Sequence, residues 1–386
     1  MAYRRRQGPR WGLILGFLVL GTAGLAIVSY IVPVKEWLPL SSAVPLRAAA
    51  SPTPVPTPEP TPETAEAHLA RGDALLAQGQ WPEAVGVYGD ALRVSPQHVT
   101  ATARSARGLL YLNRLAEGLE RAQRAVDLDP RSAEAQAVLA LALNWGHNPD
   151  RALIVARRAI ELDPKSPEAL AYLGEALVDK YRLREAEESL DKAEALDKNH
   201  PEVWRIRGYL LETNADYHAA ITAYRKAIEL APKRSYLYLS LGQALRTTRR
   251  YDEAIQAFTT AAELAPTDPR PHGGLGMVYY AREEYVRALP PLEHAVQLDP
   301  RYANGYAQMA WVYYVQRDHA RALPLFEKAI SLEPDQGRVA QYRHALGWIY
   351  LSLKQPEKAR EQFTRALELN PELQGAKEGL AQIEPR

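Results

Sequence analysis

Residues 241–266 read LGQALRTTRRYDEAIQAFTTAAELAP, and versions of this phrase recur along most of the 386-residue chain. Eight versions end in a proline, and successive prolines lie 34, 34, 68, 34, 34, 34 and 37 residues apart. These prolines are Pro96, Pro130, Pro164, Pro232, Pro266, Pro300, Pro334 and Pro371. Lys198 takes the place of proline within the 68-residue step, and an insertion of three residues near 336–339 lengthens the last step. Nine versions with one period predict nine copies of one structural unit.

Small residues occupy fixed positions in every copy. The middle of the expected first helix is Gly or Ala in all nine copies, as at Gly242. The second helix carries a small residue and, seven residues later, an Ala, as at Ala254 and Ala261. Seven residues make about two helical turns, so these residues share one face and let two helices approach closely, while larger residues such as Phe258 fill the adjacent space. Each proline ends its hairpin, and because one hairpin leaves an apolar face uncovered, the units must stack into a solenoid.

This pattern resembles the tetratricopeptide repeat (TPR), whose signature is W-x2-L-G-x2-Y, then A-x3-F, then A and P. The copy that ends at Pro371 matches it with Leu346, Gly347, Tyr350, Ala359, Phe363 and Ala366. The resemblance covers residues 65–373 and implies an all-α, right-handed superhelix of about nine helix-turn-helix repeats. Residues 374–386 are amphipathic, which predicts a C-terminal capping helix.

The N-terminal region has the features of a membrane anchor. Residues 12–32 form an uncharged run of 21 residues, and a helix of this length spans roughly 30 Å, the thickness of the hydrocarbon layer. Four arginines lie in residues 1–11, whereas only Lys35 and, further on, Arg47 follow the run. The positive-inside rule therefore predicts a single-pass protein with a cytoplasmic N-terminus and extracytoplasmic repeats. Two alternatives stay open, a cleaved signal peptide and a buried helix of a soluble protein.

Residues 33–64 connect the predicted anchor to the repeats. Proline occupies nearly every second position of residues 51–64, SPTPVPTPEPTPET. Proline removes backbone donors and restricts φ, so this segment is expected to form an extended stalk that holds the repeats away from the bilayer.

Composition and motifs argue against several classes of function. The chain has no cysteine, which excludes disulfides, thiolate metal sites and a cysteine nucleophile. Its net charge of +1 gives no indication of nucleic-acid binding. Common catalytic and nucleotide-binding motifs do not occur, and the nine histidines are scattered. We therefore expect no enzyme, no cofactor, no metal site and no small-molecule substrate.

The family resemblance implies a binding groove on the concave side of the superhelix. First helices line it at repeat positions 2, 5, 9 and 12, with the proline counted as position 32. After residue 200 these positions carry Trp, Tyr, Met and Arg, the residue types enriched at interface hot spots. The predicted protein-binding residues are Arg205, Tyr209, Tyr236, Arg246, Met277, Tyr280, Trp311, Tyr314 and Trp348. The alternative is that the aromatic residues pack against neighbouring first helices and the C-terminal capping helix. Position 9 is never Asn, so the terminal-carboxylate clamp of chaperone-binding members is not expected.

These features predict a membrane-tethered adaptor or scaffold that binds protein or peptide partners in its concave groove and organises a complex at the cell envelope. The first alternative is a cytosol-facing assembly or chaperone-like scaffold with the opposite topology. The second is a regulatory input module for a separate enzyme. The sequence does not identify the partner.

Overall fold

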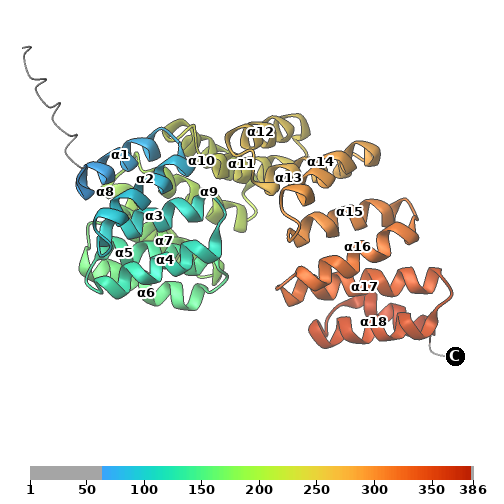
Figure 1. Cartoon of the computed structure of the whole chain (residues 1–386). Helices are drawn as coiled ribbons and strands as arrows, with labels where there is room; N and C mark the ends of the chain where they lie inside the picture. The colour runs from blue at the N-terminus through green and yellow to red at the C-terminus, as the bar shows by residue number, and fades with distance from the viewer. Residues whose placement is uncertain (1–62, 384–386) are drawn as a thin grey trace, which may run out of the picture. The chain divides into compact units, whose positions relative to one another are not determined.

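The computed structural model describes residues 63–383, so the predicted anchor at 12–32 and nearly all of the stalk at 33–64 lie outside the described residues. The described part of the chain folds into 19 α-helices and no strand (Figure 1). This confirms the prediction of an all-α solenoid. None of these helices has the length and apolarity needed to cross a membrane.

Eighteen of the helices form nine hairpins. The first helices of the hairpins are α1 (Ala65–Ala77), α3 (Val99–Tyr111), α5 (Ala133–Trp145), α7 (Pro167–Asp179), α9 (Pro201–Thr213), α11 (Ser235–Thr247), α13 (Pro269–Ala281), α15 (Ala303–Val315) and α17 (Gln336–Ser352). The second helices are α2 (Trp81–Val94), α4 (Leu115–Leu128), α6 (Pro149–Leu162), α8 (Leu183–Leu196), α10 (Tyr217–Leu230), α12 (Tyr251–Leu264), α14 (Tyr285–Leu298), α16 (His319–Leu332) and α18 (Pro356–Leu369). A final helix, α19 (Gln374–Ile383), packs on α18 and α17.

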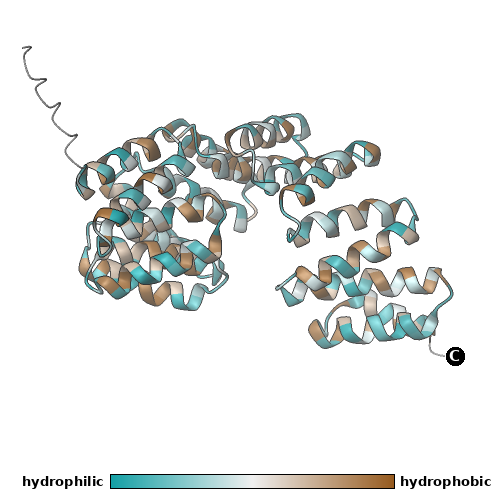
Figure 2. Ribbon diagram, viewed as in Figure 1, coloured by the Kyte–Doolittle hydropathy of each residue, from teal (hydrophilic) through white to brown (hydrophobic). Residues whose placement is uncertain are grey.

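The hairpins stack in chain order. Each second helix packs on the first helix of the next hairpin, and successive first helices such as α3, α5 and α7 also contact one another. The first helices from α3 to α15 therefore form one continuous side of the solenoid. Figure 2 shows apolar and polar residues alternating around most helices, as expected when one face of each helix is buried.

Small residues of the first helices face large residues of the second helices. A Cβ atom added at Gly208 would lie 2.6 Å from the Tyr224 ring, and one added at Gly242 would lie 2.8 Å from the Phe258 ring. Both rings are almost fully buried. The close helix crossing that the small residues predict is therefore confirmed, because no side chain larger than hydrogen fits beside these rings.

Each hairpin turn holds one residue in the left-handed region. Gly79 occupies this position in the first turn, with φ of 75°. In the other eight turns the residue is not glycine, and φ lies between 54° and 63°. These residues are Asn113, His147, Tyr181, Ala215, Arg249, Glu283, Arg317 and Lys354. The left-handed residue reverses the chain so that backbone N–H groups bond the last carbonyls of the first helix, as Asn113 does with Leu110 at 2.8 Å.

The three-residue insertion near residues 336–339 lies within a helix. The first helix α17 has 17 residues, whereas α15 has 13. The added residues extend the start of α17 by about one turn. The stacking of the following hairpin is therefore kept, since α17 still packs against α18 and α16.

The first superhelical turn closes on itself. Gly79, in the turn between α1 and α2, lies against Lys233, because an added Cβ would be 2.9 Å from the Lys233 carbonyl oxygen. Tyr236 at the start of α11 stacks on Tyr111 of α3, with ring centroids 4.8 Å apart. The Arg234 guanidinium lies 5.6 Å from the centre of the Trp81 ring. Residues of the first two hairpins thus pack directly against the start of the sixth.

Candidate functional site

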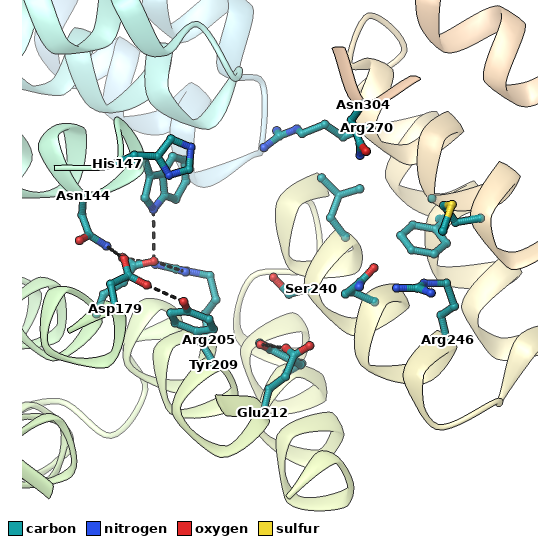
Figure 3. A pocket seen from close by; sticks show the side chains of 18 of the residues that line it. Asn144, His147, Asp179, Arg205, Tyr209, Glu212, Ser240, Arg246, Arg270 and Asn304 are labelled. Atoms are coloured by element: carbon teal, nitrogen blue, oxygen red, sulfur yellow. Dashed lines mark hydrogen bonds and ion pairs between the residues drawn. The ribbon is translucent and has the colours of Figure 1, made fainter. Parts of the chain in front are cut away.

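The concave side of the repeats holds a cavity of about 960 Å³ (Figure 3). Its lining comes mainly from six successive first helices, α5, α7, α9, α11, α13 and α15. Ligand sites in proteins usually occupy roughly 300–1,000 Å³, so this space lies at the upper end of that range. We refer to it as the concave cavity, and it is the candidate functional site.

Arg205 lies at the centre of a buried ion cluster on one wall of the concave cavity. Its guanidinium donates to both carboxylate oxygens of Glu175 at 2.7 and 2.8 Å and to Glu202 at 2.7 Å. Burial alone would lower the pKa of Arg205, but the two carboxylates hold it well above its ordinary value. The charge of Arg205 is therefore satisfied within the protein, and the cluster ties α7 to α9.

Two other carboxylates of the concave cavity have no cationic partner among residues 63–383. Asp179 accepts hydrogen bonds from Tyr209 at 2.5 Å and from Asn144 at 2.8 Å, and Glu212 accepts one from Tyr224 at 2.8 Å. Burial raises the pKa of Asp179 and of Glu212 above their ordinary values despite these hydrogen bonds. Each carboxylate is therefore partly desolvated without an ion pair to compensate.

Arg246 of α11 also lines the concave cavity, and its environment differs from that of Arg205. It pairs with no carboxylate in the described part of the chain, and its Nε atom is buried without a hydrogen-bond partner there. Burial lowers the pKa of Arg246, although the carboxylate of Glu212 opposes this at longer range. Arg270, by contrast, pairs with Asp268 at 2.7 Å. Figure 3 shows Arg246 and Asp179 on opposite sides of the cavity.

Two amide oxygens in the same lining are buried without a donor. The side chain of Asn144 on α5 is 5% exposed and that of Gln308 on α15 is 8% exposed. Neither Asn144 Oδ1 nor Gln308 Oε1 has a hydrogen-bond partner among residues 63–383. Both oxygen atoms are closed to solvent, so they lie within the wall of the cavity rather than on its open surface. No cluster of three or more histidine or carboxylate side chains in this range is arranged to hold a metal ion.

The predicted groove residues fall in three environments. Arg205, Tyr209, Arg246 and Met277 line the concave cavity. Tyr236 does not, because it is 5% exposed, stacked on Tyr111 and hydrogen-bonded to Glu202 within the closed first turn. The remaining four are Tyr280, Trp311, Tyr314 and Trp348, and all are half-buried.

These four aromatic side chains contact aromatic residues of the second helix in their own hairpin. The Trp311 ring lies 5.0 Å from Phe326, and the Trp348 ring lies 5.5 Å from Phe363, both edge to face. Such pairs stabilise the fold in addition to the area they bury. These contacts are a form of packing within one hairpin, which differs from the packing on neighbouring first helices and the capping helix that the alternative named. A role for these residues in binding stays a prediction.

Several polar lining residues were missing from the predicted set. Glu212 and Gln243 occupy repeat positions 12 and 9, and Arg270 and Asn304 occupy position 2. The repeat register therefore contained the signal. The choice of hot-spot residue types set aside Glu212, Gln243 and Asn304, whereas Arg270 is of a chosen type and was left out of the predicted set. Gln308 lies at position 6, outside the predicted stripe.

Sequence profiles of the tetratricopeptide repeat match nearly all of the described chain. One profile matches residues 47–99, 103–167, 207–269 and 239–303, a second matches 147–208, and a third matches 301–372. The protein therefore belongs to the tetratricopeptide repeat family, whose solenoids are scaffolds suited to protein–protein interaction. A comparison with curated proteins gave no match.

Solved structures with similar folds share little sequence with this chain. The APC/C hetero-tetramer Cut9–Hcn1 matches with a TM-score of 0.66 at 16% identity, over 83% of this chain and 63% of that one. The human IFIT1 dimer with m7Gppp-AAAA matches with a TM-score of 0.59 at 16% identity, over 84% of this chain and 81% of that one. Yeast Tom70 matches with a TM-score of 0.52 at 16% identity, over 83% and 88%. At this identity the likeness shows the fold alone.

Proposed function

We propose that this protein is a membrane-tethered adaptor that holds partner proteins in the concave cavity and organises a complex at the cell envelope. The observation that carries the proposal is the cavity itself, which has an open lining of charged, amide and aromatic side chains drawn from six first helices. Arg, Tyr, Trp and Met are the residue types that dominate binding energy in protein interfaces.

The dimensions of the lining favour a polypeptide partner. Packed helices lie about 8–10 Å apart, so six successive first helices present a surface several helix diameters long. A helix or an extended segment of a partner fits such a surface, as in helix-in-groove recognition. Closure of the first superhelical turn removes Tyr236 and its neighbours from solvent, which concentrates binding between α5 and α15.

The membrane tether is supported by residues 12–32 and by the arginines that precede them. An anchor followed by a proline-rich stalk would hold the repeats near the bilayer but clear of it. An adaptor placed in this way gathers its partners at one membrane.

Photocrosslinking tests the binding function. A photoreactive phenylalanine analogue at Gln243, which is exposed and lines the concave cavity, is compared with the same analogue at Glu187, which is exposed on α8 and lies outside it. In membranes of cells that express the full chain, we expect discrete crosslinked proteins from position 243 and not from 187. An equal pattern from both positions, or none from 243, would refute binding in the cavity.

A single introduced cysteine tests the topology, because the chain has none of its own. In the Glu187→Cys variant, a membrane-impermeant maleimide should react in intact cells or in cells with only an outer membrane opened. Reaction that requires lysis of the inner membrane would place the repeats in the cytosol. A chain shortened by about 40 residues would instead indicate a cleaved signal peptide.

A further inference from the structure

The concave cavity is lined by three charged side chains of both signs that form no ion pair within residues 63–383. Asp179 and Glu212 lie on α7 and α9, and Arg246 lies on α11. None of the three forms an ion pair with another residue of 63–383. Arg205 and Arg270 line the same space, but carboxylates of the protein already neutralise them. The three unpaired groups are therefore the charges that remain for a ligand.

Burial disfavours the charged forms of these three groups. The pKa of each moves in that direction, although Arg246 and Glu212 oppose the shift in one another at longer range. A ligand that carries the complementary charges would remove this penalty on binding. The arrangement is thus unfavourable for stability and favourable for recognition.

We infer that the concave cavity binds a peptide segment that carries one acidic and one basic side chain, the acid pairing with Arg246 and the base with Asp179 and Glu212. This inference rests on the proposed function and names the partner chemistry of the same site. Arg205, one of the predicted groove residues, has no such role in the inference, because Glu175 and Glu202 already bind its guanidinium.

A peptide selection tests the inference. A phage library of random 12-residue peptides is selected on the full-length chain in lipid nanodiscs, and enriched sequences are made as fluorescent peptides for anisotropy measurements. We expect the enriched peptides to carry both an acid and a base. Arg246→Gln should weaken their binding at least tenfold, and Asp179→Asn with Glu212→Gln should do the same.

Charge reversal supplies the decisive control. Arg246→Glu should bind the selected peptide poorly and should recover binding when the acid of the peptide is replaced by arginine. Arg249→Gln removes the same charge from the exposed turn three residues later and should leave binding unchanged. Because Arg246 forms no ion pair within residues 63–383, Arg246→Met should keep the melting temperature of the chain, whereas a structural arginine would not.

The outcomes separate this inference from the proposed function. Selection that enriches no peptide with both charges, or peptides whose binding ignores Arg246→Gln, overturns the inference. If crosslinking from Gln243 still captures a partner in that case, the adaptor function stands with a different ligand chemistry. Absence of any such crosslink removes the proposed function itself.

Discussion

The contact between Gly242 and Phe258 yields a sharp stability prediction. Phe258 of α12 is 2% exposed, and a Cβ atom added at Gly242 would lie 2.8 to 3.0 Å from three atoms of its ring. Carbon atoms attract best at about 3.5–4.0 Å, so these distances are repulsive. The ring cannot move away, because Gly274 of the next first helix lies against it as well.

The magnitude of Gly242→Ala follows from two opposing terms. Overpacking of a well-packed core destabilises by about 1–3 kcal/mol. Replacing a helical glycine by alanine stabilises by about 0.5–1 kcal/mol, because the unfolded chain loses freedom. We expect a net loss of about 1–2 kcal/mol in the free energy of unfolding.

Gly89→Ala is the matched control for this substitution. Gly89 lies within α2, and no atom lies within 4 Å of an added Cβ. Only the favourable helix term applies there, so the control should be stabilised by about 0.5–1 kcal/mol. Urea unfolding of the full chain, followed by circular dichroism, measures both variants. Equal shifts in the same direction would show that helices α11 and α12 do not cross as closely as described.

Three further predictions concern other parts of the repeats. Gly79→Ala should lower the unfolding midpoint and increase hydrogen exchange in α1 and α2. Gly79 has positive φ, and a Cβ added there would press on Lys233. Unchanged exchange would contradict closure of the first turn. Burial raises the pKa of Glu202, but nearby arginines and hydrogen bonds outweigh it and lower this pKa to about 2. This pKa lies below the unfolded value of about 4.3, so ionised Glu202 stabilises the folded state fully above pH 4.3, and this stabilisation is lost as the pH falls toward 2. Glu202→Gln should therefore lower the free energy of unfolding at neutral pH and make the urea midpoint less sensitive to acid. Trp311→Ala should lower the melting temperature by several degrees through loss of its Phe326 contact, and loss of binding at an unchanged melting temperature would instead assign Trp311 to the partner site.

The hairpin architecture could be predicted because its determinants are local and repeated. A glycine and a large residue sixteen positions later, such as Gly242 and Phe258, face each other within one hairpin. Nine repetitions of the pattern make the assignment insensitive to any single exception, such as Lys198 at a proline position. The left-handed turn residues were not predictable in the same way, because positions such as Tyr181 and Arg249 carry no glycine to mark them.

The candidate site could be predicted only in part. Periodicity placed Arg246 and Met277 on the concave stripe, and both line the cavity. It could not show that Arg205 is neutralised by Glu175, because that carboxylate comes from another repeat. Nor could it show that Trp311 packs on Phe326, since position 9 is both a groove position and a neighbour of the second helix.

The sequence by itself determined the repeat length, the number of hairpins and the all-helical fold, because each depends on contacts within about one period of the chain. Only the tertiary structure decided which part of the concave side is open. That outcome depends on small rotations between successive hairpins, which add up until Tyr236 meets Tyr111 and closes the first turn. Summed rotations of this kind leave no mark on any single repeat, so the position of the cavity and its unpaired charges emerges only when the whole solenoid is assembled.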